Sequence, residues 1–213
     1  TGGAARFPVE SNRPDMGNTM AELLTTPLHG LHRELGGKMV GFAGYDMPVH
    51  YPAGIMAEHT HTRTAAGLFD VSHMGQVVIS GAPFAEMAAA FEALVPMDVA
   101  GLAEGRQRDG LFLGDTGGVL DDLMFANRGD HLFVVVNAAC KGLDIARMKA
   151  ALEPGLQVRE ITDRALIALQ GPAAEQVLAT LNPAVAAMRF MDVRDVDLGG
   201  VPAWVSRSGY TGE

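Results

Sequence analysis

The chain has 213 residues, of which 48% are hydrophobic, so it can bury a sizeable core and is not a disordered chain. Its formal net charge of -9 leaves no basic surface for nucleic acid or an anionic membrane, and neither is an expected partner. The single cysteine, Cys140, excludes a disulfide framework and a cysteine-based zinc site, and it favours a reducing compartment, the cytoplasm or an organelle matrix.

The start of the chain differs in character from the rest. Residues 1–19 contain Gly, Pro and Asn without apolar periodicity, so we expect a flexible tail or a cloning remnant there. No apolar run approaches the roughly 20 residues that span a bilayer, and no signal-peptide core is present, so neither membrane insertion nor secretion is expected. The glycines of residues 36–48 indicate tight turns, because no phosphate-loop string follows a strand.

Histidines are frequent in the next part of the chain, but their spacing does not favour a metal site. Residues 54–66 are predicted to form a helix that carries His59 and His61. Two residues apart on a helix, these side chains point to different faces and cannot share a metal ion. His29 and His32 have no third ligand nearby in the sequence. We therefore expect no metal.

A second helix and a strand follow. Residues 77–80 are predicted to form a strand and residues 83–94 a helix with Pro in its first turn. Just before them, Ser72 lies beside His73, which raises the question of a serine hydrolase. Adjacent side chains of an extended segment point apart, and the G-x-S-x-G elbow is missing, so a serine nucleophile is not favoured.

Two adjacent carboxylates, Asp121 and Asp122, interrupt an apolar strand in residues 117–126. Because side chains of a strand alternate between faces, each carboxylate shares its face with apolar residues. Burying a charge without a partner costs several kcal/mol, on the order of the spare stability of a domain. We therefore expect an apolar enclosure around Asp122 and a partner for its charge.

The following segment suggests that partner. Residues 127–130 form a turn cluster and residues 131–136 a second strand, so an antiparallel hairpin is predicted. Pairing the last residue before the turn with the first after it places Asp122 opposite Val135 and diagonally beside Asn137. A carboxylate, an amide and an apolar floor suit a flat, hydrogen-bonding ring. The alternative is that the aspartates cap a turn and Asn137 caps the next helix.

The remaining pattern predicts an α+β fold with antiparallel sheets and flanking helices. A short strand at 111–113 precedes the hairpin and indicates a meander. Strands and helices then alternate irregularly, which disfavours a doubly wound sheet. The predicted elements are a helix at 141–152, strands at 158–162 and 166–170, a helix at 173–181 and a strand at 201–206.

Six strings, in this order, resemble one family: the aminomethyltransferases, or T-proteins, of the glycine cleavage system. The ordered series is more specific than any single string, and it runs from about Thr26 to the last residue. The strings are GKMVGFAGYDMPV (37–49), GLFDVSHMGQ (67–76), GGVLDDLM (117–124), VVNAA (135–139), LQGP (169–172) and SRSGYTGE (206–213).

The resemblance implies the folate-binding aminomethyltransferase fold and a tetrahydrofolate-dependent transfer. The partner would be the H-protein, which carries an aminomethyl group on its lipoyl arm. The reaction would release ammonia and form 5,10-methylenetetrahydrofolate. The implied location is the cytoplasm in a bacterium, or the mitochondrial matrix in a eukaryote.

The resemblance also implies roles for single residues. Asp122 corresponds to the catalytic residue, which also contacts folate. Met74, Val135 and Asn137 lie at positions that surround folate in the family. Glu213 corresponds to a pterin-binding carboxylate. Phe190 is the nearest candidate for an aromatic contact.

The family pattern continues beyond the last string of this chain. Residues 20–213 are therefore expected to be the incomplete N-terminal part of the folate-binding region, without the C-terminal β-domain, and inactive alone. Two alternatives stay open: a folate-dependent demethylase of the same superfamily, and a folate-binding protein without enzymatic activity.

Overall fold

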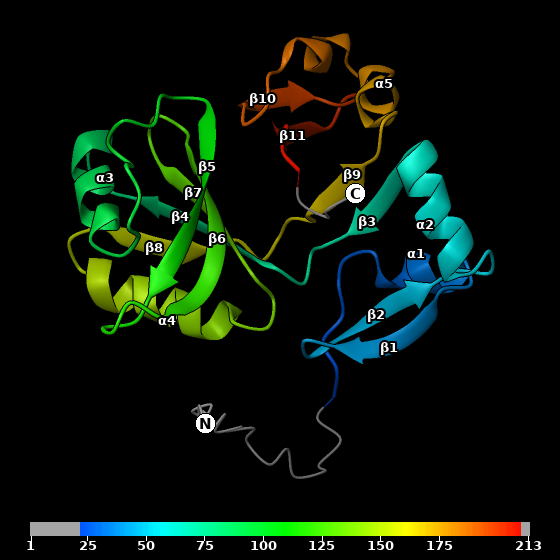
Figure 1. Cartoon of the computed structure of the whole chain (residues 1–213), viewed down its shortest axis with the longest axis horizontal. Coiled ribbons are helices and arrows are strands. Elements are labelled where there is room, and N and C mark those ends of the chain that lie inside the picture. The colour runs from blue at the N-terminus through cyan, green and yellow to red at the C-terminus, as the bar shows by residue number, and fades with distance from the viewer. Residues whose placement is uncertain (1–21, 210–213) are drawn as a thin grey trace, which may run out of the picture.

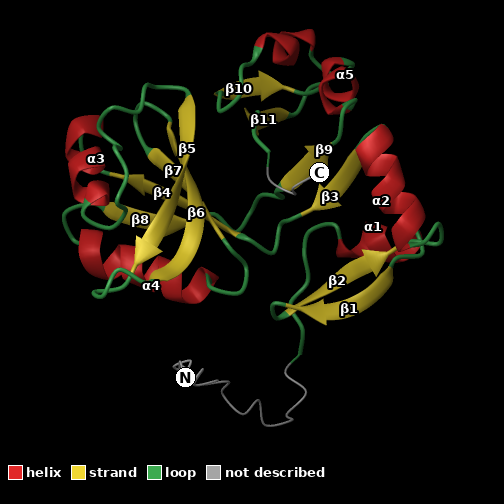
Figure 2. Ribbon diagram, viewed as in Figure 1, coloured by secondary structure: helices red, strands yellow, loops and turns green. Residues whose placement is uncertain are grey.

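A computed structural model of the chain describes residues 22–209, whose elements are labelled in Figure 1. The predicted tail, residues 1–19, and the predicted pterin ligand Glu213 lie outside the described residues. The described part has three groups of elements: a five-stranded sheet with two helices, a group with two separate strand pairs, and a smaller group late in the chain (Figure 2).

The largest group is a five-stranded sheet in which all neighbouring strands are antiparallel. Three of its strands are joined by consecutive hairpins, as the predicted meander requires, and two others extend the sheet. In sheet order the strands are β5 (Arg106–Leu113), β6 (Val119–Asn127), β7 (Leu132–Val136), β4 (Gly75–Ser80) and β8 (Gln157–Glu160).

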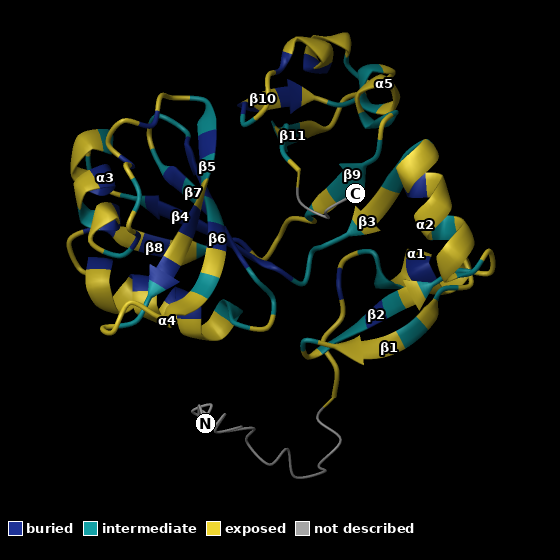
Figure 3. Cartoon of the chain, viewed as in Figure 1, coloured by how far each residue is buried: buried dark blue, intermediate teal, exposed yellow. Residues whose placement is uncertain are grey.

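Two helices, α3 (Phe84–Glu92) and α4 (Lys141–Leu152), cover one face of this sheet and bury their apolar sides against it (Figure 3). Phe91 of α3 meets Phe125 of β6 edge to face, with ring centroids 5.4 Å apart. Full burial of one such side chain contributes about 1.5–3 kcal/mol. This interface is the main core, and it fixes the sheet that carries the two aspartates.

The second group precedes and follows this sheet in the chain. Its hairpin turns at Ala43 and Gly44, where φ is 49° and 82°, as in the two-residue turns that suit a twisted hairpin. The predicted tight turn is thus present. The elements are α1 (His29–Glu34), β1 (Lys38–Phe42), β2 (Tyr45–His50), α2 (Ile55–Thr64), β3 (Gly67–Asp70) and β9 (Ile167–Gln170); β1 pairs with β2 and β3 with β9.

The third group packs its own small core and reaches the large sheet through Trp204. The Trp204 ring meets Phe133 of β7 edge to face, with centroids 5.2 Å apart, on the face of the sheet that α3 and α4 leave uncovered. The elements are α5 (Ala174–Ala179), the 3-10 helix η1 (Pro183–Ala187), β10 (Val193–Asp197) and β11 (Pro202–Ser206).

The predicted α+β class with antiparallel sheets and flanking helices is confirmed, and α4 has its predicted bounds. The strand predicted at 111–113 was too short, because β5 begins at Arg106 with four polar residues that give no apolar signal. The strands β1, β2, β3 and β10 and the helices α1 and η1 were not predicted. Within residues 22–209, every helix is too short or too polar to cross a bilayer.

Candidate functional site

Asp121 and Asp122 lie inside β6, between β5 and β7. On the β5 side, Asp121 pairs with Phe112 and Asp122 with Leu111. Gly117 adopts a φ of 81° in the turn between β5 and β6, a conformation that side chains disfavour, and so permits this tight connection. The alternative in which the aspartates cap a turn is wrong, since both are paired strand residues.

The pairing of β6 with β7 differs from the predicted register. The prediction placed Asp122 opposite Val135, whereas Val135 lies opposite Met124. The register is therefore shifted by two residues along β7. Continuing the observed pairing beyond the last strand pair places Asn137 beside Asp122.

Asn127 explains the shift. It was predicted to lie in the turn, but it is the last residue of β6 and pairs with Leu132. From within the strand, its buried side chain accepts a hydrogen bond from the Gly129 amide at 2.9 Å and donates one to the Leu102 carbonyl at 2.7 Å. These bonds satisfy the turn, so the loop begins one residue later than expected.

Asn137 joins the two carboxylates. Its Nδ2 atom lies 3.0 Å from Oδ1 of Asp121, 3.1 Å from Oδ1 of Asp122 and 3.1 Å from the Asp122 carbonyl oxygen. A single amide nitrogen, with two hydrogens, thus serves both carboxylates. The N-cap residue of α4 is Cys140, so the alternative in which Asn137 caps that helix is also wrong.

The two aspartates differ in burial, and the expectation for Asp122 was wrong. Asp122 is exposed, whereas Asp121 is half-buried and shares its face with the buried side chains of Leu123 and Phe125. On the face of Asp122, Leu120 is itself 48% exposed and encloses nothing. The carboxylate that meets the core is therefore Asp121, and Asp122 is the one free to meet a ligand.

Apolar side chains extend the face of the sheet beside Asp122. Val135 is 9% exposed and lies between Met124 of β6 and Gln76 of β4. The Gln76 amide nitrogen donates to the Arg164 carbonyl at 3.2 Å, which holds this side chain in place. A carboxylate, a shared amide and an apolar floor are therefore brought together, as the sequence predicted.

This donor set fits the polar edge of a reduced pterin. A pterin ring presents N–H donors that a carboxylate accepts, and its flat faces suit an apolar floor. Asp122 is an exposed acceptor of this kind, and the apolar side chain of Val135 lies on the same face of the sheet. Asp122 is exposed, and two cavities of about 430 and 490 Å³ elsewhere in the structure are lined by other residues.

The DVSHM string places His73 and Met74 between the large sheet and the β1–β2 hairpin. Met74 is 7% exposed and directly precedes β4. The His73 ring contacts Phe42 and Tyr45 edge to face, at centroid distances of 5.6 and 6.2 Å. Burial lowers the pKa of His73, Asp70 opposes this shift, and Lys141 adds to it.

Lys141 connects the same hairpin to the start of α4. Its Nζ donates to the hydroxyl of Tyr45 at 2.7 Å and lies 3.8 Å from a carboxylate oxygen of Glu160. Gly75 permits this approach, because a Cβ atom there would lie 2.5 Å from Cγ2 of Val136 and 2.9 Å from Cγ of Lys141. The backbone next to Asn137 is thus fixed by close packing that only glycine allows.

Sequence reasoning missed Asp144, in the first turn of α4. It is 4% exposed, and it lies close enough to Asp121 for the two carboxyl groups to interact. Burial raises the pKa of Asp144 to about 7, the neighbouring Asp121 adds to the rise, and Arg147 opposes it. Asp144 occurs in an ordinary helical pattern, which gives no sign that a third carboxylate lies behind Asp121 and Asp122.

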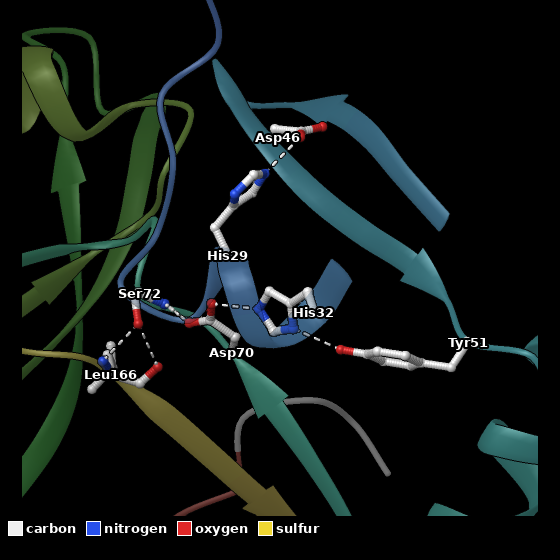
Figure 4. A network of polar contacts seen from close by, with 7 residues as sticks. All are labelled: His29, His32, Asp46, Tyr51, Asp70, Ser72 and Leu166. Carbon is white, nitrogen blue, oxygen red and sulfur yellow. Dashed lines mark hydrogen bonds and ion pairs between the residues drawn. The ribbon is translucent and has the colours of Figure 1, made fainter. Parts of the chain in front are cut away.

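A separate polar network joins α1, β2 and β3 (Figure 4). His32 lies with Nε2 2.8 Å from Oδ2 of Asp70 and Nδ1 2.7 Å from the hydroxyl of Tyr51. The His32 and Asp70 side chains are only 6% and 1% exposed. Burial alone would raise the pKa of Asp70, but hydrogen bonds from Ser72 and His32 outweigh it and hold the pKa below its usual value.

Ser72 has a structural role in this network. Its hydroxyl donates to the Leu166 carbonyl at 3.2 Å and accepts from the Leu166 amide at 3.0 Å, as Figure 4 shows. The Ser72 amide also donates to Oδ1 of Asp70 at 2.9 Å. These backbone contacts occupy the hydroxyl and agree with the expectation that Ser72 is not a nucleophile.

The roles of two further predicted ligands stay predictions. Phe190 precedes β10 in the third group and is 64% exposed. Glu213 lies outside the described residues. In residues 22–209, no three His, Cys, Asp or Glu side chains gather closely enough to hold a metal ion.

Comparisons with known proteins agree on one family. Residues 28–213 match the family described as the GCVT N-terminal domain. The chain is 41% identical over 202 residues to "Aminomethyltransferase, mitochondrial" of Dictyostelium discoideum, covering 90% of this chain and 49% of that protein. It is 40% identical over 195 residues to the aminomethyltransferase of Bacillus subtilis, covering 90% of this chain and 53% of that protein.

A solved structure shows the same fold. The glycine cleavage system aminomethyltransferase T from Bartonella henselae superposes with a TM-score of 0.80 at 35% identity, covering 89% of this chain and 51% of that one. The chain thus spans about half the length of the curated relatives it matches.

Proposed function

The chain belongs to the GCVT N-terminal domain family, and we propose that it forms the carboxylate-bearing part of a tetrahydrofolate-dependent aminomethyltransferase of the glycine cleavage system. The observation that supports this most directly is the shared hydrogen bonding of Asn137 to Asp121 and Asp122, next to the apolar floor of Val135. The family supplies the reaction class, and the geometry supplies residues suited to it.

The proposed substrates are an aminomethyl group on the lipoyl arm of the H-protein and tetrahydrofolate. Tetrahydrofolate, when bound, supplies the nitrogen that accepts the one-carbon unit. Forming the methylene bridge would break two bonds at this carbon: the amine would take up a proton and leave as ammonia, and the lipoyl sulfur would leave as a thiol. The carbon would be electron-poor in between. The protein therefore has to place a negative charge beside this carbon and exchange a proton there.

Asp122 is suited to both tasks. Its carboxylate is exposed and already oriented by Asn137, so it can accept a hydrogen bond from a ligand without a large rearrangement. Its negative charge stabilises a cationic carbon, and its free oxygen can take up a proton. An acid–base group in this position typically contributes about 10²–10⁴-fold to the rate.

The remaining predicted contacts belong to the same proposal. Met74 and Val135 are buried apolar neighbours that suit the flat face of a pterin. Phe190 and Glu213 are proposed as further contacts, made when the rest of the folate-binding region is in place. We propose that residues 20–213 form the N-terminal part of that region, and that a C-terminal β-domain completes it and covers Asp122. On this proposal the 213 residues alone are inactive.

The proposed location follows from the relatives. One is named as mitochondrial and others are bacterial. A mitochondrial matrix or a bacterial cytoplasm therefore suits the proposed role, in agreement with the single cysteine.

The test is an assay of ammonia release with the intact protein, the aminomethylated H-protein and tetrahydrofolate. We expect release at a catalytic rate only when all three are present. Turnover of a small methylated amine without the carrier would select the demethylase alternative. Folate binding without any turnover would select the non-enzymatic alternative.

A further inference from the structure

A pair of buried carboxyl groups lies directly behind the candidate site. Asp121 extends from β6 and Asp144 from α4, and the two carboxyl groups lie close enough to interact. The Oδ2 atom of each is buried, and within residues 22–209 no other group donates a hydrogen bond to either. The proposed function does not use Asp144.

Two ionised carboxylates cannot satisfy each other, because both are acceptors only. A single proton held between them supplies one donor, removes one charge and satisfies both buried oxygens. The known alternatives for satisfying a buried carboxylate are an ion pair or several N–H donors. Among the described residues, Asn137 donates to Oδ1 of Asp121, and the Cys140 thiol also interacts with the Asp121 side chain, but the Oδ2 atoms of Asp121 and Asp144 have no hydrogen-bond partner.

Charged groups on both α4 and β6 act on Asp144. Arg147 on α4 opposes protonation, as does the N-terminal position of Asp144 in that helix. Asp121 on β6 favours it, and so does burial. Cys140 carries no charge here, since burial and the carboxylates of Asp121 and Asp144 raise the pKa of its thiol. The net effect is a pKa of about 7 for Asp144.

We propose that Asp144 is protonated in the working enzyme and donates its proton to Asp121, which makes Asp144 a positioning residue for Asp122. The positioning role of Asp144 rests on the proposed function, whereas the proton shared by Asp144 and Asp121 does not depend on it. The contacts form one series: Asp144 donates to Asp121, Asn137 donates to Asp121, and the same amide donates to Asp122.

This series has a clear consequence for pH. While the proton is present, Asp121 keeps one oxygen for Asp144 and the other for Asn137. When Asp144 loses its proton, two buried negative charges repel each other, and the position of Asp121 shifts together with Asn137. Asp122 then loses its orientation as the pH rises past about 7.

The first test detects the proton without any assay of transfer. Difference infrared spectra of the intact protein, taken during a pH titration, should contain a protonated carboxyl band that disappears near pH 7 and is missing in Asp144→Asn. If the protein has no such band, or if the band titrates near pH 4 like an ordinary aspartate, the shared proton is refuted. This result stands whether or not the protein transfers aminomethyl groups.

The second test asks whether the proton positions the site. Asp144→Asn keeps a donor toward Asp121 but cannot ionise, so it should retain most of the transfer rate at pH 7 and lose the decline on the alkaline side. Asp144→Leu removes the donor and should lose at least tenfold. Asp115→Asn, an exposed aspartate at the β5–β6 turn, is the matched control. If Asp144→Asn is as impaired as Asp144→Leu, or keeps the alkaline decline, the positioning role is wrong.

Discussion

Asn137 lies across the strand pair from Asp122, and its side-chain nitrogen is 3.1 Å from the Oδ1 atom of that aspartate, although 15 residues separate them in the chain. The contact connects the end of β7 to the middle of β6, and the same nitrogen reaches Asp121. Substitutions of Asn137 and of each aspartate should therefore have separate, measurable effects on activity.

Replacing Asp122 by Asn should abolish most of the transfer while keeping part of the folate binding. The substitution preserves shape and one acceptor oxygen, but it removes the negative charge and the proton acceptor. We expect the rate of ammonia release to fall by about 10²–10⁴-fold. The measurement is the initial rate with saturating H-protein and folate, with folate binding followed by calorimetry. An unimpaired rate would refute the catalytic role, and Asp115→Asn serves as the exposed control.

Two substitutions of Asn137 should differ in a defined order. Asn137→Ala removes a donor shared by two carboxylates, and a hydrogen bond to a charged group contributes about 1.5–3 kcal/mol. We expect about a tenfold to hundredfold loss in kcat/KM. Asn137→Asp places a third carboxylate beside two others, so repulsion should make it worse than Asn137→Ala. Equal kinetics for the two variants would contradict the shared-donor geometry.

Asp70 should control acid stability. Its pKa is lowered in the folded chain, so the fold favours the ionised form. The stabilisation is fully present above the ordinary pKa of 3.8 and is lost as the pH falls through the lowered pKa. Asp70→Asn should reduce the free energy of unfolding at pH 7 by about 1–3 kcal/mol and flatten its decline below pH 4. Urea unfolding at pH 7 and at pH 3 measures both effects, and an unchanged acid decline would show that other carboxylates dominate.

Gly75 should tolerate no side chain, for reasons of space rather than of backbone conformation. An added Cβ atom would lie within 3 Å of Val136 and Lys141. We expect Gly75→Ala to destabilise the fold by about 1–3 kcal/mol and to lower the transfer rate, since both neighbours flank Asn137. Gly118→Ala is the matched control, because nothing lies within 4 Å of its added Cβ. Similar melting temperatures for the two variants would contradict this account.

The sequence predicted the elements of the site better than their pairing. Continuous apolar runs identified β6 and β7, and the turn residues between them indicated the hairpin. The register depended on whether Asn127 ended the strand or began the turn, and its buried side-chain hydrogen bonds decided this. Such bonds join distant segments, so a local pattern does not predict them.

The sequence pattern also could not predict which of the two carboxylates is buried. Alternation placed Asp121 and Asp122 on opposite faces, but it could not show which face meets α3 and α4. Asp144 and the contact of His32 with Asp70 come from pairs of segments that meet only after folding. The resemblance to a known family identified Asp122, whereas only the structure identified the group behind it.

The paired contacts of Ser72 with Leu166 also bear on how the large sheet and the β3–β9 pair can move. The chain passes between these two bodies twice, once on the way from β3 to β4 and once from β8 to β9, and the hydroxyl of Ser72 clamps the two passages side by side. Two connections held side by side allow one body to rotate against the other but resist their separation. His73 and Met74 lie in the connection from β3 to β4, so a rotation of the two bodies would change their orientation relative to Asp122.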